Sequence, residues 1–574
     1  MDNLKIAQTL RQIADILEIT NANQFKVIAY RRSAQTIENL NKDISQIYQQ
    51  NKLEQIPGVG KGIAEKIKEL IETGKCKTLQ RLEKKIPAGV LNLLNVEGLG
   101  PKKVGLFYIK YRVKTIGQLE KLAKSHRLLK LKGWGEKSEK NILRGISLYK
   151  KFRQRFALGE VYFLFQNISD ELKRSKLINR IQICGSARRA KEIVGDLDIL
   201  VTSKFPQKAI DFFVQLPLIQ KILAKGPTKA NVIIKNGLEI DLRVVKPESF
   251  GAALHYFTGS KSHNIHIRRL GMERGLRINE YGVYKTKGLV RIGGEKEKEV
   301  FKAIGLPWIP PEIREDEGEI EAGVQNKLPK LVNLRQIKGD LHLHTNWSDG
   351  SDSILAMAVA AKKEGYEYIA ITDHASPIAV TNGLNNQRIG EYLKAIKQAR
   401  KKIKGLKIFS GVEVDIKRNG ELYLPDEILK KLDLVIISIH SGFHLSRKEM
   451  TQRIIRAIKN PYTCILAHPT GRLINKRESY KCDLEEILET AKQKEILLEI
   501  NAFWARLDLN APQARLARNK GIKMVISTDA HRTESLAMMQ FGVATARRGW
   551  LKKQDIANTL PFDKLSKLLK KNRY

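Results

Sequence analysis

The sequence predicts a multidomain fold: α-helical domains at the N-terminus, an α+β domain in the middle and a (β/α)7 barrel at the C-terminus. Three observations lead to this prediction. A glycine turn before a lysine-rich helix recurs in the first third, carboxylates alternate with apolar residues in the middle, and apolar runs ending in His, Asp or Glu recur in the last part. At 574 residues the chain exceeds one ordinary hydrophobic core, so several domains are expected.

Composition favours a cytoplasmic protein with a polyanionic partner. The 103 Lys and Arg residues against 61 Asp and Glu give a net charge of +42, which favours DNA or RNA. A salt-adapted surface or a codon bias toward Lys is the alternative. No apolar run reaches the roughly 18 residues of a membrane span, and the N-terminus carries no signal-peptide pattern. Four scattered cysteines predict neither disulfides nor a thiolate zinc site.

Three similar stretches each place a Gly-x-Gly turn between an apolar residue and a helix. They read IPGVGKGIAEKI from Ile56, VEGLGPKKVGLFY from Val96 and LKGWGEKSEKNIL from Leu131. Glycine permits the turn and close backbone approach, and the helix N-terminus offers amides to a phosphate. One copy is a common turn, but three resemble the helix-hairpin-helix motif, which binds the DNA backbone. The glycines expected to contact DNA are Gly58, Gly60, Gly98, Gly100, Gly133 and Gly135.

An amphipathic helix is expected in NQFKVIAYRRSAQTI, which begins at Asn23. The prediction places Phe25, Ile28 and Ala29 inward, and Lys26 with the following arginines outward. The basic face is either a solvated surface or a grip on a DNA 5′ phosphate, and the residues themselves leave both alternatives open.

A carboxylate triad is predicted in the middle of the chain. RIQICGSARRAKEIVGDLDILVTS indicates a strand, a Gly-Ser turn and a second strand whose alternation places Asp196 and Asp198 on one face. GLEIDLRVV adds Asp241 on a third strand. Three carboxylates suit two Mg²⁺ ions, and the arginines after the turn suit a triphosphate. A surface strand with alternating acids is the alternative, which the Gly-Ser-x-Arg-Arg turn disfavours.

Residues 1 to about 315 resemble a family X DNA polymerase, the group that contains polymerase beta. The motifs CGSARR, GDLDIL, EIDLR and ALHYFTGSKSHNIHIR occur in the family's order. The resemblance implies a nucleotidyltransferase palm with a thumb-like subdomain and Mg²⁺ or Mn²⁺ as cofactor. It also implies dNTPs and gapped or primer-template DNA with a 5′-phosphate end as substrates.

The resemblance also implies roles for single residues. Asp196 and Asp198 would bind both metals, and Asp241 would activate the primer 3′-hydroxyl. Arg155 would join Ser186 and Arg189 at the triphosphate. The full set of implied nucleotide contacts is Arg155, Gly185, Ser186, Arg189, Tyr256, Phe257, Gly259, Lys261 and Asn264. The implied DNA contacts beside the turn glycines are Lys26, Lys66 and Arg268.

Two positions depart from the family pattern. Lys261 stands where vertebrate members carry an aspartate beside the base. Lys66 aligns with the Schiff-base lysine of the family's deoxyribose-phosphate lyase, but Gly62 replaces a second basic residue of that pocket. Lys66 is therefore either a lyase residue or a phosphate contact.

The last part of the chain begins after a proline-marked, acidic stretch, LPWIPPEIREDEGEIEAGVQNKLPKLVNL, which indicates a linker. Short apolar runs then alternate with amphipathic stretches, a pattern typical of βα units around a parallel barrel. The seven runs are GDLHLHT, YIAITDHA, KIFSGVEVDI, LDLVIISIHSG, CILAHP, ILLEINAF and KMVISTDAH.

Nearly every run ends in a metal-ligating residue type. The C-terminal ends of barrel strands converge, so these side chains are expected to meet. A single strand-end histidine is usually a hydrogen-bonded residue, but six of the chain's 11 histidines lie in this pattern. Two or three Zn²⁺, Mn²⁺ or Fe²⁺ ions would suit the set. Its members are His342, His344, Asp349, His374, Glu413, His440, His468, Asp529 and His531.

Residues from about 336 to 574 resemble the polymerase-and-histidinol-phosphatase (PHP) domain. The motifs HxHTxxSDG, TDHA, GxE, AHP and TDAH carry the resemblance. It implies a distorted (β/α)7 barrel that hydrolyses phosphoesters, supported around the metals by Asp373, Glu499 and Asn501. Fusion of such a domain behind a family X polymerase is the bacterial and archaeal arrangement.

Together these patterns predict a monomeric repair polymerase that fills short gaps and trims DNA as a 3′→5′ exonuclease. Abasic-site endonuclease or 3′-phosphatase action is open, as are a small-molecule phosphoesterase and a purely structural barrel. The expected parts are two helix-hairpin-helix domains (1–85 and 86–150), palm (151–246), nucleotide- and template-selecting subdomain (247–315), linker (316–335) and PHP domain (336–574).

Overall fold

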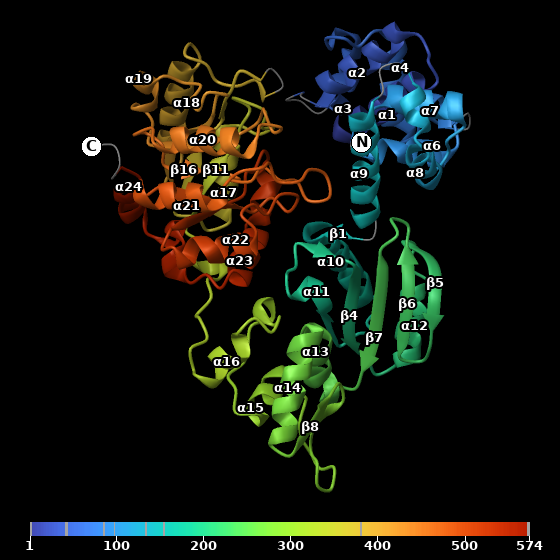
Figure 1. Ribbon diagram of the computed structural model, residues 1–574, viewed down its shortest axis with the longest axis vertical. Helices are drawn as coiled ribbons and strands as arrows, with labels where there is room; N and C mark the ends of the chain where they lie inside the picture. The colour runs from blue at the N-terminus through green and yellow to red at the C-terminus, as the bar shows by residue number, and fades with distance from the viewer. Residues whose placement is uncertain are drawn as a thin grey trace. The chain divides into compact units, whose positions relative to one another are not determined.

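A computed structural model describes residues 3–38, 40, 44–83, 86–96, 98–131, 135–152, 155–378 and 381–570. The chain divides into two compact units, Met1–Arg153 and Gln154–Tyr574. Each is described by itself (Figure 1). Among the described helices, none combines the length and the apolar character needed to span a bilayer.

The first unit is helical, as the glycine turns predict. Its long helices α1 and α7 approach closely, because a Cβ at Gly105 would come within 2.6 Å of the Ile19 carbonyl oxygen. Ile6, Leu10 and Phe107 lie in its buried core. The helices are α1 (Asn3–Ile19), α2 (Gln24–Glu38), α3 (Ile44–Gln49), α4 (Lys61–Thr73), α5 (Lys77–Glu83), α6 (Ala88–Asn92), α7 (Pro101–Tyr111), α8 (Ile116–Lys124) and α9 (Glu136–Phe152).

A five-stranded sheet opens the second unit, in the order β2-β4-β7-β6-β5. The strands β4 and β7 run parallel, and the other neighbours run antiparallel. The elements are α10 (Leu158–Arg174), β2 (Arg180–Ile183), α11 (Gly185–Arg188), β4 (Asp196–Thr202), α12 (Pro206–Val214), β5 (Ile219–Lys225), β6 (Lys229–Ile234) and β7 (Glu239–Val245). A two-stranded pair, β1 (Phe156–Ala157) and β3 (Ile193–Val194), lies beside them.

A smaller α+β subdomain follows and continues into the proline-marked segment. Its elements are α13 (Phe250–Thr258), α14 (Lys261–Glu273), β8 (Leu276–Asn279), β9 (Gly282–Lys285), β10 (Arg291–Gly293), α15 (Glu297–Ala303) and α16 (Glu319–Val324). The acidic segment is not a bare tether, because Glu319 is fully buried and its Oε1 lies 2.6 Å from His263 Nδ1.

Seven parallel strands form the C-terminal barrel in the order β11-β12-β14-β15-β16-β17-β18, and Leu343 bridges to Ala530 beside the last strand. Every predicted run contains a strand. The seven are β11 (Gly339–Leu343), β12 (Tyr368–Ile371), β14 (Lys407–Asp415), β15 (Leu434–Ser438), β16 (Ile465–Leu466), β17 (Leu497–Asn501) and β18 (Met524–Ser527), and a short eighth strand, β13 (His374–Ala375), pairs with β14.

Amphipathic helices pack around this barrel (Figure 1). Met357, Ile396 and Ile454 of three such helices share one buried core with the strand residues Ile371 and Ile437. The helices are α17 (Ile354–Lys363), α18 (Ile389–Lys402), α19 (Asp426–Leu429), α20 (Arg447–Ile458), α21 (Leu484–Gln493), α22 (Ala511–Asn519), α23 (Met539–Arg548) and α24 (Phe562–Lys570).

Candidate functional sites

Three carboxylates meet on the first sheet of the second unit. In the parallel pair β4–β7, Asp198 is the register partner of Asp241, and Asp196 is the partner of Glu239. Leu197 is fully buried while Asp196 is exposed, so the predicted alternation along β4 is confirmed. Adjacent parallel strands therefore bring together residues 43 positions apart.

The charges of this triad oppose one another. Burial, followed by the charges of Asp196 and Asp241, raises the pKa of Asp198 to about 7. Burial and then Asp241 also raise the pKa of Asp196. Gathered carboxylates with raised pKa values suit a divalent cation, which relieves their repulsion. Gly185 lies directly beside them, since a Cβ there would come within 2.2 Å of Asp198 Oδ2.

The two arginines after the Gly-Ser turn have different partners. Arg189 is buried, and its Nη1 donates to the Thr258 carbonyl at 2.8 Å while its Nε donates to Glu315 at 3.0 Å. Arg188 instead forms two hydrogen bonds of 2.6 and 2.9 Å with Glu297. Both arginines are thus held by carboxylates, Arg188 by Glu297 and Arg189 by Glu315, and a triphosphate contact of Arg189 stays a prediction.

The turn between α13 and α14 gathers most of the remaining nucleotide candidates. Asn264 Nδ2 donates to the carbonyls of Tyr256, at 2.7 Å, and Gly259, at 3.2 Å. A Cβ at Gly259 would come within 2.4 Å of Asn264 Oδ1, so this turn excludes a larger residue. The Phe257 ring lies under the Arg243 guanidinium, 4.5 Å from its centroid.

Other candidates of this region lie nearby or at the surface. Arg268 Nε donates to the Asn264 carbonyl at 3.3 Å, and Lys261 begins α14 as an exposed residue. Ser186 lies in α11 and is half-buried, and Arg155 precedes β1 and is exposed.

The helix-hairpin-helix turns of the first unit have the predicted backbone geometry. Gly58 and Gly98 have φ angles of +84° and +82°, which non-glycine residues rarely adopt. Gly60 and Gly100 are the N-caps of α4 and α7. A Cβ at either position would have nothing within 4 Å, so these backbones are open to a ligand.

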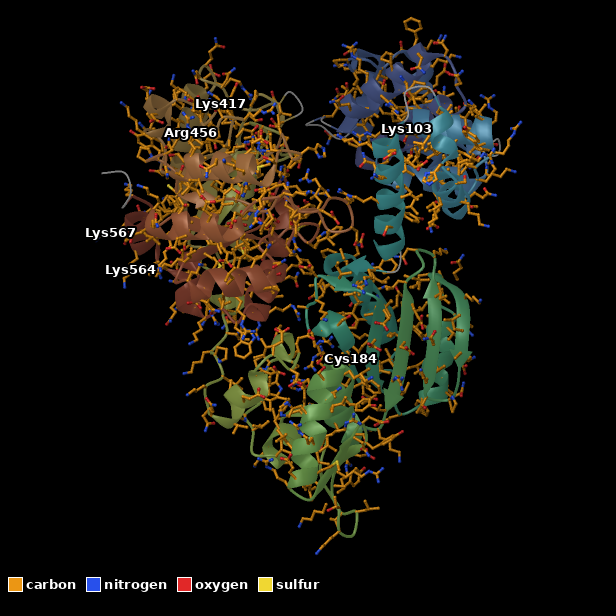
Figure 2. All side chains as sticks on the ribbon, in the orientation of Figure 1. Lys103, Cys184, Lys417, Arg456, Lys564 and Lys567 are labelled. Carbon is orange, nitrogen blue, oxygen red and sulfur yellow. The ribbon has the colours of Figure 1, made fainter. Side chains whose placement is uncertain are left out.

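Lysines adjoin these turns. Lys66 Nζ donates to the Gly62 carbonyl at 2.7 Å. Lys103, labelled in Figure 2, donates from Nζ to the Gly98 carbonyl at 2.9 Å. In the third repeat Gly135 directly precedes α9, whereas Gly133 lies outside the described residues.

Two of the three inward positions predicted for α2 are wrong, whereas Ala29 packs against the core and Lys26, Arg31 and Arg32 are exposed as predicted. Phe25 and Ile28 are 83% and 58% exposed, whereas Val27 and Tyr30 are buried. The buried positions continue along the helix to Ala34 at helical spacing. The stripe formed by Val27, Tyr30 and Ala34 therefore faces the core, and Phe25 and Ile28 lie outside it. Lys26 is exposed as expected, beside the two exposed apolar side chains.

In the barrel the predicted ligands converge at the C-terminal ends of the strands. Three groups have ligand atoms within 4.8 Å of one another: His344 with Asp349, His374 and His531; His342 with His344 and Asp529; and His374 with Glu413 and His440. His468 joins them, since its Nε2 lies 2.9 Å from Glu413 Oε1. Within the described residues, the first sheet's carboxylates form no group this tight.

Backbone strain accompanies two of these side chains. His468 and Asp529 have positive φ angles of 28° and 54°, uncommon for residues with a Cβ. Such strain persists only where the surroundings enforce it, and it is often found at functional sites. The register of β13 on β14 contributes directly, because it pairs His374 with Glu413.

The surroundings shift the pKa values of neighbouring histidines in this cluster in opposite directions. Burial opposes charge on His342, but the carboxylates of Glu499, Glu413 and Asp529 hold its pKa well above the usual value. Burial and then the neighbouring histidines lower the pKa of His344 to about 3. A buried neutral imidazole between carboxylates is suited to bind a cation.

Several buried ligand atoms of this cluster face other ligand atoms, as His374 Nδ1 does at 2.8 Å from Glu413 Oε2, without the geometry of a hydrogen bond. They are Nε2 of His342, both ring nitrogens of His344, Nδ1 of His374 and Oε2 of Glu413. Buried polar atoms are normally satisfied, so these atoms fit the role of metal ligands. Divalent metals are general among PHP domains, and the residues present fit such ions.

Outer residues hold the ligands in place. Glu499 Oε1 lies 2.7 Å from His342 Nδ1, and Asn501 Nδ2 donates to Asp529 at 3.0 Å. Asp373 accepts from the Thr345 amide at 2.7 Å. All three supporting residues therefore contact the ligand-bearing segments.

Two further residues escaped the sequence interpretation. Asp415 Oδ1 lies 2.6 Å from His440 Nδ1, and Arg506 Nε lies 3.4 Å from Asp529 Oδ2. Asp415 lies two positions after Glu413 on the same strand, so strand alternation could have indicated it. Arg506 approaches from a distant loop, and no local pattern indicates it.

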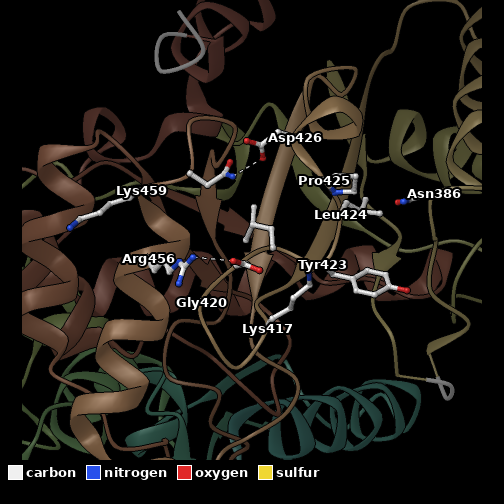
Figure 3. A pocket seen from close by; sticks show the side chains of 12 residues that line it. Asn386, Lys417, Gly420, Tyr423, Leu424, Pro425, Asp426, Arg456 and Lys459 are labelled. Carbon is white, nitrogen blue, oxygen red and sulfur yellow. Dashed lines mark hydrogen bonds and ion pairs between the residues drawn. The ribbon is translucent and has the colours of Figure 1, made fainter.

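A pocket of about 620 Å³ lies beyond the end of β14 (Figure 3). Lys417, Arg456 and Lys459 contribute positive charge to its lining. Arg456 is paired with Glu421 at 3.0 Å, and none of the lining residues is a member of the ligand cluster. The pocket therefore lies at the barrel rim and does not include the candidate metal ligands.

Three parts of the chain match known domain families. Residues 1–76 match a helix-hairpin-helix domain, residues 253–315 match the DNA polymerase beta thumb, and residues 340–503 match the PHP domain.

Curated relatives extend these matches. "DNA polymerase/3'-5' exonuclease PolX" of Bacillus subtilis (strain 168) is 38% identical over 574 residues, which is 100% of both chains. A "probable phosphatase" of Thermoanaerobacter sp. (strain X514) is 31% identical over 245 residues, or 41% of this chain and 95% of the relative. "DNA polymerase lambda" of Rattus norvegicus is 25% identical over 346 residues, or 54% of this chain and 56% of the relative.

Proposed function

This chain belongs to the family X DNA polymerases that carry a C-terminal PHP domain, and on that premise we propose that it fills short gaps in DNA and trims DNA 3′ ends. Residues 1–85 and 86–150 would hold DNA, 151–246 and 247–315 would add nucleotides, and 336–574 would remove them, with 316–335 as the linker. The substrates would be dNTPs and gapped DNA with a 5′ phosphate, bound by a monomer.

Nucleotide addition is assigned to the sheet site. Mg²⁺ or Mn²⁺ held by Asp196, Asp198 and Asp241 would supply the charge that stabilises the attacking and leaving oxygens. Asp241 accepts the proton of the primer 3′-hydroxyl, whose oxygen attacks the α-phosphorus while pyrophosphate leaves. The primer grows by one nucleotide in each cycle.

Side chains around the triad orient the incoming nucleotide. Arg155, Ser186 and Arg189 hold the triphosphate by charge-assisted and hydroxyl hydrogen bonds. Tyr256 and Phe257 form the sugar pocket at the α13–α14 turn. Asn264, Lys261 and Arg268 then face the base, the template or the minor groove.

Phosphodiester hydrolysis is assigned to the barrel. Two or three ions, with Zn²⁺, Mn²⁺ and Fe²⁺ as candidates, would supply Lewis acidity and an activated nucleophile when bound. The residues of the cluster hold them, with His342 oriented by Glu499 and His440 by Asp415. Arg506, 3.4 Å from Asp529, is placed to balance the charge of a bound phosphate.

The observation that supports the proposal is the presence of two separate clusters of candidate metal ligands in one chain, three carboxylates on the sheet and a histidine–carboxylate cluster in the barrel. Separate sites predict separable activities. Asp198→Ala is expected to reduce primer extension about a thousandfold while sparing strand shortening, because it removes a ligand of one site only. His344→Ala is expected to do the reverse.

The assay uses the full chain and a 5′-labelled primer on a one-nucleotide gapped duplex, with Mn²⁺ and with or without dNTPs. Asp211→Ala and His444→Ala serve as matched controls, since both residues lie outside the two sites. Shortening that survives His344→Ala would remove the nuclease assignment. Extension that survives Asp198→Ala would remove the polymerase assignment.

A second candidate for the barrel is a phosphatase acting on small phosphomonoesters. The similarity between the barrel part of this chain and the Thermoanaerobacter relative, over 95% of that relative's length, favours the phosphatase. Turnover of a small phosphomonoester far above that of DNA would support this candidate. Abasic-site cleavage and 3′-phosphate removal are tested in the same assay with the corresponding DNA ends.

A further inference from the structure

Barrel side chains hold the main chain of both candidate triphosphate arginines. Asn475 Nδ2, in the loop after β16, donates to the Arg155 carbonyl at 2.9 Å. Arg548 Nη1, at the end of α23, donates to the Arg189 carbonyl at 2.7 Å. Two distant parts of the barrel therefore contact the two arginines of the nucleotide site.

The second contact extends to the Arg189 side chain through a shared carboxylate. Glu315 Oε1 accepts from Arg189 Nε at 3.0 Å and from Arg548 Nη1 at 3.1 Å. The side chains of Arg189, Glu315 and Arg548 are 10%, 11% and 17% exposed. Thr258 holds the other side of the Arg189 guanidinium through its carbonyl. Low exposure limits solvent screening, so this ion network is stronger than a surface pair.

Arg189 also lies close to the carboxylates of the sheet site through the Gly185 turn. The Arg189 backbone N–H donates to the Gly185 carbonyl at 3.3 Å, and a Cβ at Gly185 would come within 2.2 Å of Asp198 Oδ2. A continuous charged path therefore leads from the barrel helix α23 through Glu315 and Arg189 to the polymerase site.

We propose that Arg548, although it belongs to the barrel, is a positioning residue of the polymerase site that sets how tightly Arg189 binds the triphosphate of the incoming nucleotide. The inference rests on the proposed role of Arg189. A carboxylate beside Arg189 competes with a triphosphate for the guanidinium. Arg548 partly neutralises the Glu315 carboxylate and holds the Arg189 backbone through its carbonyl. The Arg189 guanidinium is therefore held less tightly by Glu315 and can bind the nucleotide.

Arg547 offers a matched control on the same helix. It forms a two-point ion pair with Glu312, at 2.8 and 3.1 Å, and so anchors α23 to the same segment without contacting Arg189. Loss of Arg547 therefore tests packing of the helix, and loss of Arg548 tests the path to Arg189.

The experiment measures single-nucleotide insertion into one-nucleotide gapped DNA by the full chain. Arg548→Ala is expected to raise the KM for dNTP about tenfold while kcat and strand shortening change less than about twofold. Arg548→Lys should recover part of the loss because it keeps the charge. Arg547→Ala should leave KM within about twofold of the wild type. Arg548→Met keeps the aliphatic stem, and should repeat the KM effect where the alanine variant folds poorly.

A double variant tests the path itself. Glu315→Gln in the Arg548→Ala background should return KM toward the wild-type value, because the competing charge is gone. Equal KM increases in Arg547→Ala and Arg548→Ala would overturn the inference in favour of general packing. An unchanged KM in Arg548→Ala and in Arg548→Met, with a raised KM in Arg189→Ala, would overturn the inference about Arg548 but not the proposed role of Arg189. An unchanged KM in Arg189→Ala would overturn the proposed role of Arg189.

Discussion

The surroundings of Asp198 disfavour the charge that the carboxylate needs in order to bind a cation. Asp198 lies between two other carboxylates on a half-buried strand face, and its pKa is raised to about 7. Near neutral pH a proton therefore competes with a cation for this carboxylate. The proton must leave before the ligand set carries its full charge.

The palm site is consequently expected to bind Mn²⁺ more tightly as the pH rises through about 7. Below this value each pH unit should raise the Mn²⁺ concentration for half-maximal extension about tenfold, and above about pH 8 the requirement should level off. Single-nucleotide extension across an Mn²⁺ series at several pH values measures it. A requirement that stays constant between about pH 6 and 7 would contradict the raised pKa.

Among the elements, the turn before α7 assigns different tasks to its two glycines. Gly98 has a φ of +82°, whereas Gly100 has a φ of −88° and caps the helix. The first glycine is required by backbone conformation. The second leaves open space above the helix N-terminus, where a phosphate would approach.

Alanine at these two positions should therefore have different effects. Gly98→Ala is expected to destabilise the first unit by about 1–2 kcal/mol, because a Cβ is strained in the left-handed region. Gly100→Ala should cost less stability but weaken DNA binding, because its methyl group would stand in the open approach. Thermal unfolding and DNA-binding anisotropy measure the two effects. Equal losses of DNA affinity without a difference in Tm would contradict this division of roles.

At the scale of the whole molecule, the second unit joins its first sheet domain to the barrel by close packing. Trp504, from the loop after β17, lies against Gly159 of α10, where a Cβ would come within 2.3 Å of its Cγ. Phe541 packs edge-on against Tyr162 with ring centroids 5.5 Å apart. Arg472 adds two hydrogen bonds to Glu192, at 2.9 and 2.6 Å.

Gly159→Ala is expected to lower the stability of this unit by about 1–3 kcal/mol, because the added methyl group overpacks the junction. Gly390→Ala in α18 is the control, since a Cβ there meets nothing within 4 Å and alanine favours a helix. Thermal unfolding of the two variants provides the comparison. A Tm for Gly159→Ala as high as that of Gly390→Ala would show that the junction is loosely packed.

Local sequence determined the features that depend on spacing along the chain. Strand alternation predicted that Asp196 and Asp198 share a face, and strand-end positions in a parallel barrel predicted that the nine histidine and carboxylate ligands converge. Glycine at positions 58 and 98 allowed the two turns to be predicted, because few other residues tolerate those φ angles. These features need only a short stretch and a known repeat.

Tertiary structure decided what depends on contacts between distant segments. The inward positions predicted for Phe25 and Ile28 on α2 are wrong, because the core buries Val27 and leaves Phe25 exposed. Arg188 and Arg189 are neighbours of the same type, yet Glu297 takes one and Glu315 orients the other. Arg506 and Arg548 likewise reach their sites from remote elements. Periodicity records which face of an element is apolar, whereas the partner of a charged side chain is set only when the elements pack.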